Sequence, residues 1–137
     1  MGANLKAETL KILGDQTRLR VAYLLVASKR SLCVCEIVDA LNLPQYQVSK
    51  SLVMLRRAGL VEVDRNGTWG YYHPKVEDQV NEVLFGFVND FCSGEPFGSD
   101  LDNLQKRLAL REAGKCVVGF VPQKELQKLM RKKGVTV

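Results

Sequence analysis

Apolar residues recur at helical spacing through most of this chain and predict a mainly α-helical protein. Residues 4–13 form a short helix candidate that Gly14 ends, and Asp15 can cap a buried central helix over residues 16–27. Two further helices are predicted over residues 35–41 and 45–57, separated by Asn42-Leu43-Pro44, because proline cannot continue a helix. Two short helices joined by a tight turn, the second polar on its outward face, are typical of a helix-turn-helix.

After Gly59 the pattern changes from helical periodicity to strict alternation. Residues 60–65 alternate apolar and polar positions, and residues 68–73 can return as the partner strand. Asn66-Gly67 between them is typical of a type I′ hairpin turn. A hairpin placed here is the wing of a winged helix-turn-helix, so the predicted fold is mainly α with a β-hairpin wing.

A long apolar stripe follows the hairpin. Pro74 precedes a helix predicted over residues 76–91, in which one face carries Val76, Val80, Val83, Leu84, Phe87, Val88 and Phe91. A small winged domain buries little surface alone, so we expect this stripe to form a homodimer interface. The alternative is that it packs in the core.

The last third of the chain reads as an extension. Residues 93–99 have the composition of a linker, followed by a helix predicted over 101–110, a strand over 115–121 and a basic helix over 123–133. We therefore predict a DNA-binding and dimerisation domain over residues 1–92 and a C-terminal extension of open role over residues 93–137.

Composition and charge fit one soluble domain with an appendage. The 137 residues are 46% hydrophobic and 26% charged, with no apolar run long enough for a bilayer and no secretory leader pattern. We expect a cytoplasmic protein without membrane contacts. The net charge of +5 is uneven, since residues 76–102 hold seven acids and no Lys or Arg while bases gather on either side. This clustering indicates a surface that faces a polyanion.

Four cysteines and a single histidine limit the chemistry. In a cytosolic chain we expect Cys33, Cys35, Cys92 and Cys116 to act as ligands or redox groups rather than as a disulfide scaffold. One imidazole and no glycine-rich phosphate loop argue against most hydrolases and kinases, so we do not expect an enzyme. His73 stands alone, and we expect it to be structural.

Residues from about 10 to 73 resemble the ArsR/SmtB family of metal-sensing repressors. The matching segments are 12–20 (ILGDQTRLR), 32–37 (LCVCEI), 48–52 (VSKSL), 55–61 (LRRAGLV) and the wing ending in Tyr71-Tyr72. The resemblance implies a dimeric repressor that binds double-stranded operator DNA without a cofactor and releases it when an ion binds. The segment Leu-Cys-Val-Cys resembles the metal-binding box of the family's arsenite/antimonite and cadmium/lead repressors.

Two departures from the family's metal-binding patterns narrow the choice of inducer ion. The family's zinc, nickel and cobalt sensors use histidines on the helix after the wing, and residues 76–91 contain none. The cadmium/lead repressors add cysteines near the N-terminus, and no cysteine precedes Cys33. The remaining resemblance is to the arsenic branch, so As(III) or Sb(III) is the expected inducer. Some members of that branch carry a third cysteine at the position that Val38 occupies here.

Soft ions select thiolates, and arsenite prefers three sulfurs, as the resemblance implies. Cys33 and Cys35 supply two. Cys116 is the first candidate for the third, Cys92 the second, and a small cellular thiol remains possible. Residues i and i+2 of a helix point to nearly opposite sides, so we expect binding to hold the turn at Cys33 and Cys35 in a non-helical state or to unwind it. We also expect the helix N-terminus to lower the pKa of these thiols.

The polar face of residues 45–57 is the predicted DNA reader. Base contacts are expected from Gln45, Gln47, Ser49 and Lys50, and phosphate contacts from Arg56, Arg57, Arg65 and Asn66. Two alternatives stay open: a redox repressor in which the cysteines oxidise, and a C-x-C thiol enzyme or metal-transfer protein. The second has no need of a recognition helix and a wing.

Overall fold

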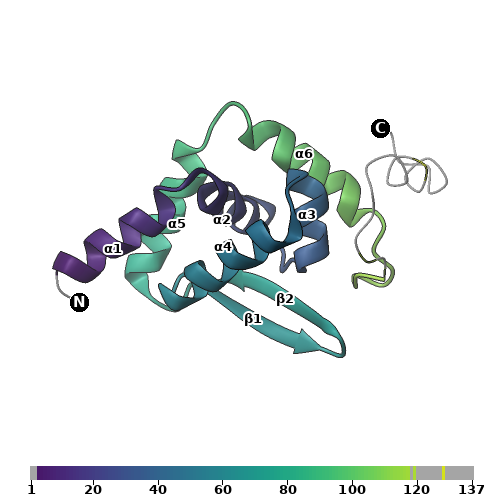
Figure 1. Ribbon diagram of the computed structural model, residues 1–137, viewed down its shortest axis with the longest axis horizontal. Coiled ribbons are helices and arrows are strands. Elements are labelled where there is room, and N and C mark those ends of the chain that lie inside the picture. Colours follow the sequence, from purple (N-terminus) through teal and green to yellow (C-terminus); the bar gives the residue numbers. More distant parts are fainter. Residues whose placement is uncertain (1–2, 118, 120–127, 129–137) are drawn as a thin grey trace.

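A computed structural model describes residues 3–117, 119 and 128 of the chain (Figure 1). Its elements, in order, are α1 (Ala3–Leu13), α2 (Gln16–Ser28), α3 (Val34–Leu41), α4 (Gln45–Arg57), β1 (Val61–Asn66), β2 (Trp69–Pro74), α5 (Gln79–Phe91) and α6 (Phe97–Leu108). The predicted mainly helical fold with a helix-turn-helix and a hairpin wing is confirmed. No helix among the described residues is long and apolar enough to cross a membrane.

The helix boundaries follow local signals. The Asp15 side chain accepts a hydrogen bond from the backbone N–H of Arg18 at 3.0 Å, which caps α2 as predicted. Asn42 ends α3 in the left-handed conformation. Gly59 follows α4 with φ +75°, a conformation that favours glycine, and its N–H donates to the Arg56 carbonyl. Asn42 thus starts the short turn between α3 and α4, and Gly59 lies in the turn between α4 and β1.

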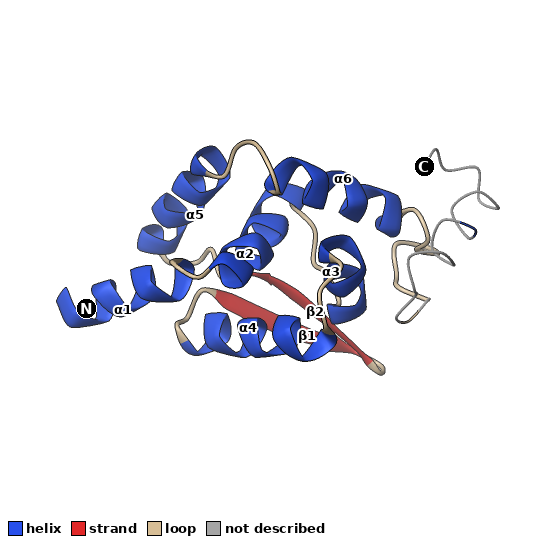
Figure 2. Ribbon diagram, turned by 45° about the horizontal axis from the view of Figure 1, so that its top comes forward, coloured by secondary structure: helices blue, strands red, loops and turns tan. Residues whose placement is uncertain are grey.

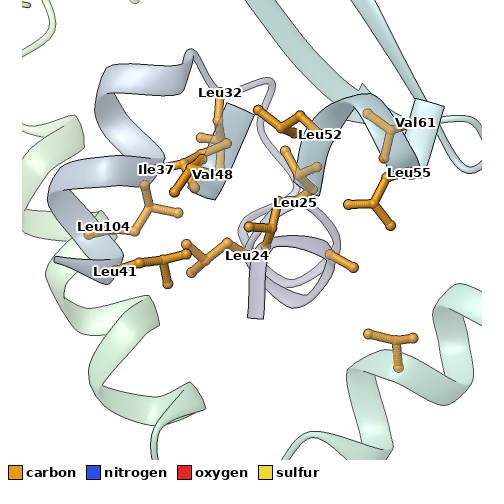
Figure 3. Packing of buried hydrophobic residues seen from close by; sticks show 14 of the residues in the cluster. Leu24, Leu25, Leu32, Ile37, Leu41, Val48, Leu52, Leu55, Val61 and Leu104 are labelled. Atoms are coloured by element: carbon orange, nitrogen blue, oxygen red, sulfur yellow. The ribbon is translucent and has the colours of Figure 1, made fainter. Parts of the chain in front are cut away.

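The core of the DNA-binding unit lies between α2, α3 and α4. Figure 3 shows Leu24 and Leu25 of α2 facing side chains of the two following helices. The fully buried members from α3 and α4 are Ile37, Val48, Leu52 and Leu55. The predicted i, i+4, i+7 face of α4 is therefore its inward face, and the opposite face is left to solvent.

The hairpin differs from prediction at its turn. Asn66 pairs with Trp69, so the two loop residues are Gly67 and Thr68 rather than Asn66 and Gly67. Among these residues only Gly67 has a positive φ, +63°, which fits a turn with glycine at its first central position. Trp69 and Tyr71, two residues apart in β2, lie on the same face of the strand.

Helix α5 starts later than predicted. It begins at Gln79, because Asp78 rather than Pro74 provides the cap: its side chain accepts from the Val80 N–H at 2.8 Å. Phe85 and Val88 pack in the core. Leu84 is half-buried against the core, and the other members of the stripe are exposed: Val76, Val80, Val83, Phe87 and Phe91. Most of the stripe therefore lies outside the core of a single chain.

Helix α6 starts earlier than predicted and belongs to the main core. It begins at Phe97, inside the segment whose composition indicated a linker, and buries Leu104 and Leu108 in the same cluster as α2 and α3. It lies alongside α3 in both views (Figures 1 and 2). The predicted strand over 115–121 does not form in its described part, where Lys115 makes one isolated bridge to Glu112. The predicted helix over 123–133 lies outside the described residues apart from Lys128.

Candidate metal centre

Three cysteine thiols meet at the start of α3. The Sγ atoms of Cys33 and Cys35 are 3.0 Å apart, and those of Cys35 and Cys116 are 3.5 Å apart. All three sulfur atoms lie within 4.8 Å of one another, and each residue is 2% exposed. The chain thus brings together the two cysteines of the C-x-C segment and the first candidate for a third sulfur, 81 residues beyond Cys35.

The backbone at Cys33 explains how a C-x-C pair can converge. Cys33 is the N-cap of α3 and has extended dihedral angles, φ −87° and ψ 161°, so its side chain is not bound to the helical spacing. The Glu36 carboxylate accepts the Cys33 N–H at 3.1 Å and holds this conformation. The backbone at Cys33 is already non-helical without an ion, so of the two expected routes the structure favours holding this turn non-helical over unwinding α3.

The wing closes one side of the thiol cluster. Trp69 and Tyr71 pack against the three cysteines, and the Tyr71 hydroxyl accepts a hydrogen bond from the Cys116 N–H at 3.0 Å. The same strand pairs with the loop before α3, because Leu32 and Tyr72 exchange backbone hydrogen bonds of 2.9 and 2.7 Å. The candidate centre therefore contacts the wing directly as well as α3.

Two buried ion pairs hold α6 and the tail on α3. Arg107 Nε donates to Asp39 Oδ2 at 2.7 Å, and the two side chains are 1% and 4% exposed. Arg111 donates to both Glu36 oxygens at 2.6 Å and to the Ser31 carbonyl at 2.7 Å. Charge-assisted bonds of this kind are short and directional, so they fix where the following tail begins. Sequence reasoning had not assigned Glu36, Arg107 or Arg111 to the centre.

Hydrogen bonds among the three thiols shift their pKa values in opposite directions. Hydrogen bonds from Cys33 and Cys35 lower the pKa of Cys116, and the nearby Arg107 guanidinium acts in the same direction. Hydrogen bonding to Cys116 raises the pKa of both Cys33 and Cys35, and burial adds to this. The thiol whose pKa falls is therefore Cys116 in the tail, whereas the expectation placed the lowered pKa at the helix N-terminus.

The second candidate sulfur lies elsewhere. Cys92 ends α5 and is buried in the main hydrophobic core, apart from the three clustered thiols. His73 contacts Asp64 Oδ2 at 2.9 Å and the Pro74 carbonyl at 3.2 Å. These partners lie within the hairpin, and His73 is not one of the three residues of the cluster.

The predicted DNA-contacting residues lie on α4 and the hairpin. Those that are exposed are Gln45, Lys50, Arg56, Arg57, Arg65 and Asn66. Ser49 is half-buried, and the half-buried Gln47 donates its amide to Thr17 Oγ1 at 2.8 Å, so a base contact by Gln47 would replace that bond. Tyr46, which the sequence reasoning did not assign, is 74% exposed and precedes Lys50 by four residues, so the two residues share a helix face.

The chain is similar to known transcription regulators. Residues 15–63 match the family described as "Bacterial regulatory protein, arsR family". The arsenical resistance operon repressor of Escherichia coli is 38% identical over 108 residues, 66% of this chain and 92% of that protein. An uncharacterized HTH-type transcriptional regulator of Methanocaldococcus jannaschii is 44% identical over 78 residues, 57% of this chain and 85% of its own.

A third relative matches over a smaller share of its length. The arsenic resistance transcriptional regulator ArsR1 of Pseudomonas putida is 44% identical over 81 residues, 58% of this chain and 62% of that protein. The relatives are regulators, which removes the ground for a C-x-C thiol enzyme. Together with the helix-turn-helix and its wing, these matches show that the chain belongs to the arsR family of bacterial regulatory proteins.

Proposed function

We propose that this regulator is a repressor that releases its operator when arsenite or antimonite binds Cys33, Cys35 and Cys116. The observation that carries the proposal is the gathering of three buried sulfur atoms within 4.8 Å at the first helix of the helix-turn-helix. Two relatives, an arsenical resistance operon repressor and an arsenic resistance transcriptional regulator, support the choice of ligand.

The donor set fits a trivalent, thiophilic element. Soft ions select thiolates over carboxylates and imidazoles, and the cluster offers three sulfurs. Binding of As(OH)₃ replaces three As–O bonds by three As–S bonds, and three water molecules leave. With Cys116 as thiolate, two of the required protons come from Cys33 and Cys35 and one from solvent. Neither arsenic nor sulfur changes oxidation state, and the complex formed is neutral.

A path leads from the thiols to the DNA-reading helix. Ile37 and Leu41, on the helix that carries Cys35, are buried in the same core as Val48 of α4 (Figure 3). A packed core transmits small displacements because it has few voids to absorb them. Closing three sulfurs around one ion draws α3, the wing and the tail together. We propose that this displaces α4 and the wing from the geometry that fits DNA.

Operator binding is proposed to need two copies of the chain. The exposed residues of α5 form an apolar surface with α1, lined by Leu10, Val80, Val83, Leu84 and Phe87 around a groove of about 450 Å³. A surface of this kind is normally covered, and a twofold dimer places two recognition helices on two half-sites. We propose that the exposed arginines of α4 and the wing contact phosphates. Gln45 and Lys50 are proposed to contact bases.

The test is arsenite titration of the operator complex under full reduction. Wild type, Cys33→Ser, Cys35→Ser and Cys116→Ser are compared by fluorescence anisotropy of labelled DNA, with Cys92→Ser as the matched control. We expect Cys33→Ser, Cys35→Ser and Cys116→Ser to bind operator normally but to keep it when arsenite is added. Cys92→Ser should release operator as wild type does. A normal response of Cys33→Ser and Cys35→Ser would refute the proposal.

One observation favours a second candidate, a redox repressor. Cys33 and Cys35 hold their sulfurs 3.0 Å apart, within reach of a disulfide after a small movement. The two thiols would lose two protons and two electrons, and peroxide as the oxidant would be reduced to two water molecules. Release by peroxide alone, with no response to arsenite under reduction, would establish this function instead.

A further inference from the structure

Cys116 reaches the other two thiols without a regular element of its own. It follows α6 by eight residues, in a stretch of the described tail where Glu112 and Lys115 form an isolated bridge instead of a helix or strand. A short irregular segment has little intrinsic preference for one position, so contacts from outside must place its sulfur. Two such contacts come from side chains around the thiol cluster.

The first contact is made by the wing. Tyr71 presents its hydroxyl to the Cys116 N–H at 3.0 Å, while its ring packs on the thiols. The hydrogen bond is to the backbone of the very residue that carries the sulfur, so it fixes Cys116 directly. Tyr72, the next residue, packs its ring on the main core instead.

The second contact supports the first. The Arg111 guanidinium lies 5.6 Å from the centroid of the Tyr71 ring and is itself held by Glu36 and by the Ser31 carbonyl. Arg111 thus connects the tail, the N-terminus of α3 and the wing at one place. The Tyr71 ring is therefore restrained between the guanidinium and the thiol cluster.

We propose that Tyr71 is a positioning residue for the third sulfur, which makes the wing part of the ion-binding centre. This inference rests on the proposed function for its ligand but concerns a different residue and a different element. The Tyr71 hydroxyl holds Cys116 beside Cys33 and Cys35, and an ion that engages Cys116 acts on the wing through the same bond. Loss of the hydroxyl leaves all three thiols in the chain but releases the third from its place.

The first experiment measures the position of Cys116 without any ion. Wild type, Tyr71→Phe and Tyr72→Phe are alkylated with iodoacetamide under reduction, and labelling of each cysteine is followed by peptide mass spectrometry. We expect Tyr71→Phe to raise the alkylation rate of Cys116 by about threefold to tenfold, the range of one net hydrogen bond. Cys92, buried in the other cluster, should keep its rate. Equal rates at Cys116 in both variants, or a parallel rise at Cys92, would overturn the inference.

The second experiment measures the effect on the response. We expect Tyr71→Phe to raise the arsenite concentration for half-release of operator by about threefold to tenfold, with Tyr72→Phe unchanged. X-ray absorption should show the sulfur coordination of arsenic falling from three towards two in Tyr71→Phe alone. If wild type does not respond to arsenite, the proposed function fails while the alkylation result still decides the role of Tyr71. Suppose instead that wild type responds, and that Tyr71→Phe has the same arsenite concentration for half-release and the same sulfur coordination of arsenic. The inference about Tyr71 then fails, while the proposed function stands.

Discussion

The buried pair between Arg107 and Asp39 is expected to be among the most costly contacts to break. It joins α6 to α3 across 68 residues of sequence, with 2.7 Å between Nε and Oδ2 and side chains 1% and 4% exposed. Arg107→Met keeps an unbranched chain of similar length but removes the guanidinium. Asp39 then loses this buried partner, and the Arg107 bond to the Gly119 carbonyl is lost as well.

The magnitude follows from desolvation. Removing one partner of a buried ion pair costs about 3–5 kcal/mol, because the other charge stays in the interior without compensation. A domain of this size has a free energy of unfolding of about 5–15 kcal/mol. Arg107→Met should therefore remove at least about a fifth of the free energy of unfolding. The double variant Arg107→Met/Asp39→Leu removes both charges and should recover most of that loss.

Urea unfolding followed by circular dichroism measures these differences, with protein concentration held fixed because a dimer's stability depends on it. The matched control is Lys11→Met, which breaks the ion pair with Glu8 whose side chains are 75% and 64% exposed. The free energy of unfolding of Lys11→Met should equal that of wild type within experimental error. Equal losses in Arg107→Met and Lys11→Met, or a double variant no more stable than the single one, would refute the reasoning.

Three further predictions concern the core, a helix cap and the apolar surface. Leu52→Ala leaves a cavity at a residue 1% exposed and should cost about 2–5 kcal/mol in urea unfolding, so a loss below 1 kcal/mol would contradict the packing described. Asp15→Ala removes the cap of α2 and should cost about 1 kcal/mol, whereas Asp15→Asn should cost less. Phe87→Glu places a charge on the exposed face of α5 and should convert dimer to monomer in sedimentation velocity and weaken operator binding; an unchanged dimer would contradict the proposed interface.

The elements of the DNA-binding unit were predictable because their signals are local. The cap at Asp15, the break at Pro44 and the turn at Gly59 each act within a few residues, and the structure has all three helix ends there. The errors were also local in origin. Asp78 competes with Pro74 as the start of α5, and Ser-Gly-Glu-Pro hid the start of α6 at Phe97.

The candidate centre was predictable in chemistry but not in geometry. Thiophilic chemistry selected cysteines, yet nothing near Cys116 in the sequence says where the tail lies. Its place depends on pairs such as Arg111 with Glu36, which are 75 residues apart. One signal was present: Glu36 stands three residues after Cys33, the spacing of a capping box, and it indicates a non-helical residue at Cys33. Reading that spacing would have shown that the two thiols can meet without unwinding the helix.

Trp69 is the single tryptophan of the chain, and it packs against the three clustered thiols. The protein therefore carries one indole fluorophore, and that fluorophore lies against the thiols of the candidate centre. Its emission needs no label and is expected to change when an ion binds the thiols, while anisotropy of labelled DNA reports on the operator; a titration with operator alone gives the contribution of DNA to the emission. Recording both signals in one stopped-flow mixing experiment would separate the time course of ion capture from that of DNA release, and so give the order of the two events.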